Sequence, residues 1–288
     1  MSHILLLGAG FSRNWGGLLA NEIFDYLIGQ NEISQDEYLR TVLWNHKTTG
    51  GFENALAEIQ VAFAADPAKY APSLHRLQSA VLNVFGRMNQ AFFDAKGIEF
   101  QQDIHRMLRT FLVQFDAIFT LNQDALLEHH YFRHIALAGP RRWNGAQLPG
   151  LRRIPNNEVI VDPSWGKDTW VPLEDFRIEN GLQPCFKLHG SSNWKDSEGG
   201  SLLVIGGNKS RTIRSHAILT WYFEQFREIL SEGGARLVVI GYGFRDPHVN
   251  DVIIGAVQRS GLQFFVIDPS GSDVVRHANP WECQYFCV

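Results

Sequence analysis

The fold class is decided by the stretch His3-Ile4-Leu5-Leu6-Leu7-Gly8-Ala9-Gly10-Phe11-Ser12. Residues 4–7 form a short, unbroken apolar run, which is typical of a strand buried on both faces of a parallel sheet. The glycine turn at residues 8–10 follows, and then a helical pattern of apolar residues at Leu18, Ile23 and Leu27. A strand, a glycine turn and a helix are the opening of a nucleotide-binding α/β unit.

Later apolar runs extend this pattern along the chain. Strands are expected at Asp116–Thr120, Cys185–Leu188, Ser201–Ile205, Arg236–Ile240 and Gln263–Ile267. Helical patterns cover Gln123–Tyr131, Trp221–Leu230 and His248–Arg259. Because strands and helices alternate, we expect an α/β fold with a Rossmann-like, mostly parallel, doubly wound sheet.

Two long segments interrupt the alternation. Residues 31–113 show helical patterns and no convincing strand, with Ser34 and Glu37 forming an expected capping box, so we predict a helical insertion. Residues 139–183 are rich in proline and glycine without periodicity, so we predict a loop-rich insertion. We interpret residues 1–288 as a single Rossmann domain carrying both insertions.

Composition excludes several classes of protein. The chain has 288 residues, 45% hydrophobic and 19% charged, which argues against extensive disorder, and it has no apolar run long enough to span a membrane. Three cysteines cannot build a disulfide framework in a chain of this size, so we expect a cytoplasmic protein. A net charge of -4 argues against direct nucleic-acid binding.

Polar or glycine-rich motifs follow five of the predicted strands, where ligands bind in such sheets. The first is the turn Gly8-Ala9-Gly10, which could bring backbone amides to a pyrophosphate. The full G-x-G-x-x-G pattern fails because residue 13 is arginine, and a purely structural turn is the alternative. Next comes Asn122 with Asp124, for which helix capping is the alternative.

The other three motifs lie further along the chain. His189-Gly190 at a strand end offers a candidate general base. Gly241 opens a second glycine turn, and Asp268 ends a strand with a carboxylate suited to a ribose hydroxyl. No metal is expected, because Glu128-His129-His130 lacks a ligand spacing, and Cys283 and Cys287 lack two further partners.

The order of these motifs resembles the sirtuin family, through Gly8-Ala9-Gly10-Phe11-Ser12, Thr120-x-Asn122-x-Asp124 and His189-Gly190. The segment Gly241-Tyr242-Gly243-Phe244-x-Asp246-Pro247-His248-x-Asn250 looks like that of bacterial sirtuin-like NAD hydrolases of antiphage defence. Two departures separate the chain from protein-deacylating sirtuins. It lacks the two C-x-x-C pairs that hold a structural zinc, and Leu121 stands where the family has glutamine.

The resemblance implies hydrolysis of NAD, as a substrate, to nicotinamide and ADP-ribose. Asn122 would hold the ribose or the attacking water, His189 would act as general base, and Asp124 would orient the nicotinamide amide. The nucleotide would be bound by Gly8, Ala9, Gly10, Ser12, Gly241 and Asp268, the last at the adenosine ribose. A protein deacylase and a non-catalytic NAD or ADP-ribose sensor remain as alternatives.

The resemblance also implies assembly. The motifs end at Asp268, which leaves about twenty residues and no room for a sensing domain on this chain. We therefore expect a homo-oligomer that works with a separate HerA-type ATPase, an Argonaute-type protein being the alternative partner. Aromatic residues in the helices at 81–115 are expected to supply the contacts.

Overall fold

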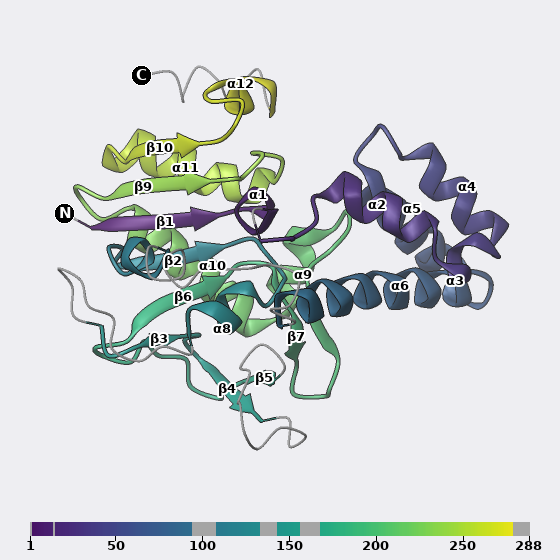
Figure 1. Cartoon of the computed structure of the whole chain (residues 1–288), viewed down its shortest axis with the longest axis horizontal. Helices are drawn as coiled ribbons and strands as arrows, with labels where there is room; N and C mark the ends of the chain where they lie inside the picture. Colours follow the sequence, from purple (N-terminus) through teal and green to yellow (C-terminus); the bar gives the residue numbers. More distant parts are fainter. Residues whose placement is uncertain (1, 14, 94–107, 133–142, 156–167, 279–288) are drawn as a thin grey trace.

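A computed structural model describes residues 2–13, 15–93, 108–132, 143–155 and 168–278, and its centre is a six-stranded parallel sheet (Figure 1). In spatial order the strands are β10 (Gln263–Ile267), β9 (Arg236–Ile240), β1 (His3–Leu7), β2 (Ala117–Thr120), β6 (Gln183–Lys187) and β3 (Ala146–Gln147). The expected Rossmann-like α/β fold is therefore confirmed.

The chain starts in the middle of this sheet and builds it outward in both directions. From β1 it adds β2 and then β6 on one side, and later β9 and β10 on the other. Leu7 is the last residue of β1 and pairs with both Thr120 of β2 and Ile240 of β9, so three strands end at the same level. Strand order reverses at β1, and ligands bind outside such reversal points.

Helices of the first hundred residues form a module beside the carboxyl ends of these strands (Figure 1). We call α2 to α6 the helical module: α2 (Ala20–Ile28), α3 (Asn31–Ser34), α4 (Glu37–Asn45), α5 (Gly51–Ala65) and α6 (Pro67–Phe93). Residues 108–112 are also helical, and the described parts of the predicted 31–113 insertion contain no strand. The expected cap of α4 is wrong: Ser34 ends α3, and Asp36 caps α4 by accepting a bond from the Leu39 amide.

The remaining helices belong to the sheet and its loops. They are α1 (Ala9–Arg13), α8 (Leu126–His130), α9 (Lys209–Ser215), α10 (Ala217–Leu230), α11 (Pro247–Ser260) and α12 (Asp273–Ala278). Among the described residues, every helix falls short of the length and apolarity that a membrane span requires.

A second sheet replaces much of the predicted loop-rich insertion. Its order is β4 (Leu151–Ile154), β5 (Thr169–Pro172), β7 (Gly190–Lys195) and β8 (Ser201–Leu203). The described part of 139–183 also contains β3, so the expectation of loops there is wrong in part. These strands are short, and their alternation is hidden by prolines and by polar residues. The sheet is anchored by a tryptophan pair, since Trp170 of β5 lies opposite the fully buried Trp194 of β7.

Two glycine turns touch each other where β1 and β9 end. The Gly8 amide donates to the Ile240 carbonyl at 2.9 Å, and the Gly10 amide donates to the Gly241 carbonyl at 3.0 Å. A Cβ on Gly8 would lie only 2.4 Å from the Gly241 oxygen, and one on Gly241 would lie 2.4 Å from the Phe11 nitrogen. Gly241 also has a φ of 64°, which favours glycine. The turns therefore meet because neither has a side chain there.

This contact predicts opposite effects for two glycine substitutions. Gly8→Ala forces a methyl group into backbone atoms and should lower the free energy of unfolding by about 1–3 kcal/mol. Gly86→Ala is the control, because its Cβ has nothing within 4 Å on the exposed face of α6. It should raise stability by about 0.5–1 kcal/mol, since alanine favours helix more than glycine does. Urea denaturation of both variants measures the difference, and equal stabilities would contradict the close approach.

Candidate functional site

A small, narrow cavity lies at the carboxyl ends of β1 and β2. It brings together three of the predicted site residues, Ser12, Asn122 and Asp124. The other lining residues are Leu7, Phe11, Thr120, Leu127 and Lys187.

Asn122 joins the two halves of this site. Its side-chain nitrogen Nδ2 donates to the Gly8 carbonyl at 3.0 Å and to Ser12 Oγ at 2.8 Å. Its backbone amide donates to Thr120 Oγ1 at 3.0 Å. Both protons of the side-chain amide are thus used, which leaves Oδ1 as the atom that can accept a bond from a ligand. Asn122 is not a helix cap here, so that alternative is excluded.

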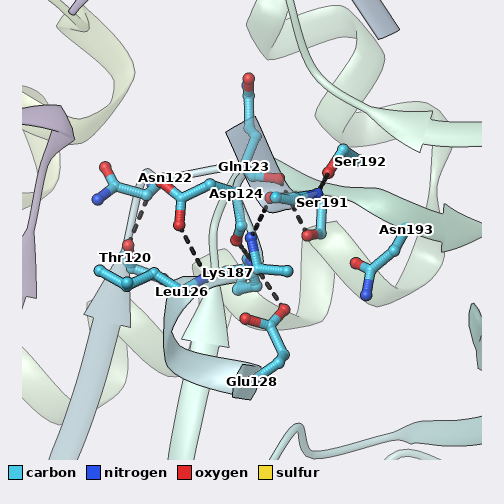
Figure 2. A network of polar contacts seen from close by, with 12 residues as sticks. Thr120, Asn122, Gln123, Asp124, Leu126, Glu128, Lys187, Ser191, Ser192 and Asn193 are labelled. Atoms are coloured by element: carbon cyan, nitrogen blue, oxygen red, sulfur yellow. Dashed lines mark hydrogen bonds and ion pairs between the residues drawn. The ribbon is translucent and has the colours of Figure 1, made fainter. Parts of the chain in front are cut away.

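The side chain of Asp124 bonds to the first residue of α8, as the helix-capping alternative predicted. Its carboxylate Oδ1 accepts a hydrogen bond from the Leu126 amide at 3.0 Å, at the first residue of α8. Its backbone carbonyl accepts a bond from Lys187 Nζ (Figure 2). Asp124 therefore holds the local turn while it lines the cavity, and its expected role toward nicotinamide stays a prediction.

Beneath Asp124 lies a buried ion pair that sequence reasoning did not identify. Lys187 Nζ lies 2.8 Å from Glu128 Oε1 (Figure 2). The Lys187 side chain is 2% exposed, and the Glu128 side chain is completely buried. Burial raises the pKa of Glu128, and the attraction of Lys187 opposes that rise. The ion pair joins β6 to α8 directly under the cavity.

His189 lies in a second cluster, at the end of the neighbouring strand β6. Its Nε2 is 2.8 Å from Nε2 of His248, and the two rings lie 5.1 Å apart. Burial lowers the pKa of His189 to about 3 and also lowers the pKa of His248, while Asp246 opposes both shifts. Both imidazoles are therefore neutral near pH 7. The N–H of one ring donates a hydrogen bond to the unprotonated nitrogen of the other.

The loop that carries Asp246 and His248 is held in an unusual shape. Phe244 has a φ of 52°, in the left-handed region that side chains avoid. Asn250 Nδ2 donates to the Phe244 carbonyl at 2.9 Å, and the Tyr242 hydroxyl donates to Asn250 Oδ1 at 2.9 Å. These buried bonds fix the loop, and such strain is typical of functional sites.

Lys209 connects this loop to the helical module. Its ammonium group lies 2.8 Å from Asp246 Oδ1 and 2.8 Å from Glu53 Oε2 of α5. Burial opposes the charge on Asp246, but His189 and Lys209 hold the pKa of that carboxyl below its ordinary value. This position of Lys209 could not be predicted from the sequence, because Glu53 is more than 150 residues away in the chain.

The helical module also reaches the Asn122 loop through Asn89. This buried side chain of α6 accepts a bond from the Ala125 amide at 2.9 Å and donates to Ser192 Oγ at 3.0 Å. Neither Asn89 nor Lys209 lies in a recognisable motif, so only the structure identifies them.

The other residues predicted to bind the nucleotide follow strands β1, β9 and β10. The amides of Gly8 and Gly10 donate to protein carbonyls, as described above, and so does the Gly241 amide, to Ile267 at 3.2 Å. Asp268 follows β10, two strands from β1, and its carboxylate accepts a bond from the Ser270 amide at 2.8 Å. The structural alternative for the first turn is therefore supported, and phosphate and ribose binding stay predictions.

These features define a Rossmann-like α/β protein with a polar site at the reversal of strand order. A profile of the SIR2-like domain family matches residues 116–286, more than half of the chain, and the protein belongs to that family. Domains of this family use NAD. The matched stretch includes Asn122, His189 and the Asp246–His248 loop, but β1 and its glycine turn precede it. A search of curated proteins found no match.

The buried ion pair predicts a non-additive pair of substitutions. Lys187→Met leaves the Glu128 carboxylate buried without its partner and should cost about 3–5 kcal/mol of stability. Adding Glu128→Leu removes the unpaired charge, so the double variant should regain most of that loss. Urea denaturation of the two single variants and the double variant measures the coupling, and simple additivity would contradict the pair.

Proposed function

We propose that the protein hydrolyses NAD at the bond between nicotinamide and ribose, giving nicotinamide and ADP-ribose. The observation that carries the proposal is the placement of Asn122 and a neutral His189 beyond adjacent strands, β2 and β6, in a chain of the SIR2-like family. The Leu188 amide donates to the Thr120 carbonyl at 2.9 Å, so the two loops start side by side.

Asn122 serves the reacting sugar in this proposal. Cleavage of an N-glycosidic bond passes through a state in which positive charge develops on the ribose. Oδ1 of Asn122 can accept a bond from a ribose hydroxyl or from the attacking water, and its bonds to Gly8 and Ser12 hold it still. A fixed dipole of this kind stabilises developing charge without reorganisation.

His189 serves as the general base. Because its imidazole is neutral, it has a lone pair that can take a proton from water or from a ribose hydroxyl. Ionised Asp246 stands near it and favours the imidazolium that results. The Asp124 carboxylate, at the cavity wall, is proposed to orient the nicotinamide amide.

The rest of the dinucleotide extends out of the small cavity. We assign the phosphates to Ser12 and the turn of Gly8, Ala9 and Gly10, with Gly241 beside them, and the adenosine ribose to Asp268. The Ser12 hydroxyl accepts from Asn122 and still has its own proton to donate.

The cytoplasmic location inferred from cysteine usage also stays a prediction.

An NAD assay with two variants tests the proposal. The purified chain is incubated with NAD, and nicotinamide release is followed by chromatography. Asn122→Ala and His189→Ala should each reduce the rate by at least about 100-fold, the usual contribution of such groups. Asn45→Ala and His75→Ala, at exposed positions on α4 and α6, should keep the wild-type rate.

The same experiment separates the alternative functions. Binding of NAD without its loss, measured by calorimetry, would favour a sensor. Deacylation of an acyl-lysine peptide coupled to NAD would favour a protein deacylase. Because Asn122 is buried and bonded, far-ultraviolet dichroism must show that Asn122→Ala is folded. A chain that neither binds nor cleaves NAD would contradict the proposal.

We further propose that the chain acts in antiphage defence as a homo-oligomer with a separate HerA-type ATPase, or alternatively with an Argonaute-type protein. The expected contacts from the helices at 81–115 stay a prediction. Among the aromatic residues described there, Phe111 is 36% exposed, whereas Phe85, Phe92 and Phe115 are buried. Other exposed apolar side chains include Tyr26, Trp44 and Val61 of the helical module and Phe265 and Ile267 of β10.

Light scattering tests the proposed assembly. At micromolar concentration the purified chain should have the mass of an oligomer, a whole-number multiple of 32.7 kDa greater than one chain. Large exposed apolar groups favour such association. Co-expression with a HerA-type ATPase should produce one larger complex. A monodisperse monomer that is unchanged by the ATPase would contradict both parts of the proposal.

A further inference from the structure

The second cluster, formed by His189, Asp246 and His248, has the composition of a metal site. Two imidazoles and one carboxylate each direct a ligand atom to the same place, and all three atoms lie within 4.8 Å of one another. His189 lies in the turn after β6, Asp246 in the loop after β9, and His248 in the first turn of α11. Their convergence is therefore a product of the fold and not of neighbouring positions in a helix.

The electrostatics of the cluster favour the forms that bind metals. A metal ligand must offer a lone pair, so a histidine must be neutral and an aspartate ionised. The contact of 2.8 Å between the two Nε2 atoms requires at least one neutral imidazole, and the Lys209 ammonium group 2.8 Å from Asp246 Oδ1 pairs with an ionised carboxylate. His189 is 3% exposed, while Asp246 and His248 are half-buried.

The loop also gives up a favourable contact to hold Asp246 in place. Asp246 is the N-cap residue of α11, a position where aspartate usually accepts a bond from the helix, yet its side chain makes no such bond. Its carboxylate turns to Lys209 instead. The Tyr242 hydroxyl accepts a bond from the Asp246 amide at 3.2 Å, and the left-handed Phe244 completes the turn.

We propose that His189, Asp246 and His248 bind one divalent transition-metal ion, of which Zn²⁺ is the representative. Two histidines with one carboxylate and an open position are a common ligand set for such ions, whereas Mg²⁺ and Ca²⁺ take oxygen ligands. The sequence expectation of no metal did not consider this trio, because residues 189 and 246 are far apart in the chain.

The geometry requires only a small adjustment. Two nitrogens bound tetrahedrally to zinc lie about 3.3 Å apart, given Zn–N distances of about 2.0–2.1 Å. The two Nε2 atoms are 2.8 Å apart, so the rings separate slightly when the ion binds, and the proton between them moves to Nδ1 of the ring that carried it. The Lys209 ammonium stays on Asp246 Oδ1 as an outer partner, and its charge moderates the affinity.

A bound ion would also affect the proposed reaction. It would take the lone pair of His189 that the reaction uses as a base, so Zn²⁺ would inhibit NAD hydrolysis reversibly. This consequence depends on the proposed function, whereas metal binding itself does not. The two are therefore measured separately.

Calorimetric titration with zinc chloride tests the site. The full chain, without a polyhistidine tag and freed of metal by a chelator, should bind one ion per chain. His248→Ala and Asp246→Asn should each weaken binding at least tenfold, because each removes one of three ligands. His75→Ala, at an exposed position on α6, should bind zinc as the wild type does.

Cobalt(II) gives a second measurement that needs no variant. Bound to two histidines and a carboxylate, it should show the intense visible absorption of low-coordinate cobalt, and zinc should abolish that absorption. The proposal is overturned if the wild type binds no ion, if cobalt shows no such absorption, or if folded His248→Ala and Asp246→Asn bind zinc as tightly as the wild type. Zinc that binds but leaves NAD turnover unchanged would overturn the role of His189 as base and leave the metal site standing.

Discussion

The backbone contact between the two glycine turns is the constraint on which the rest of the site depends. The Gly8 amide donates to the Ile240 carbonyl and the Gly10 amide to the Gly241 carbonyl, and neither Gly8 nor Gly241 has room for a Cβ. This contact brings the ends of β1 and β9 together at the reversal of strand order. From there, the Gly8 carbonyl receives the side chain of Asn122. His248, seven residues after Gly241, contacts His189 through a hydrogen bond between their Nε2 atoms.

The site is built by two parts of the molecule. The parallel sheet supplies the strand ends, and the helical module supplies Asn89 and Glu53. Asn89 fixes the Asn122 loop through its backbone, and Glu53 acts on Asp246 through Lys209. Figure 1 shows the module beside the carboxyl ends of the central strands, where both contacts become possible. The helical insertion is thus part of the site as well as a neighbour of it.

The sequence predicted what depends on local pattern and missed what depends on distant contacts. The apolar run at Ile4–Leu7 and the later runs identified five strands of the central sheet, because buried parallel strands are continuously apolar. Of the second sheet, only β8 was expected, within Ser201–Ile205. β7 was missed because it is mostly polar, with Trp194 as its one large apolar residue. Asn122 and His189 were found at strand ends. Lys209 and Asn89 meet their partners only when the chain folds, so their spacing along it carries no signal. His248 stood in the Gly241–Asn250 motif, but its contact with His189 could not be read from the sequence.

Through the ion pairs of Lys209, the helical module affects the electrostatics around His189 and His248. Lys209 is held by carboxylates on both sides, one from α5 and one from the loop after β9. The positive charge of Lys209 disfavours the protonated forms of His189 and His248. A carboxylate on α5 thus takes part in setting the charge around the two imidazoles by holding that ammonium group in place.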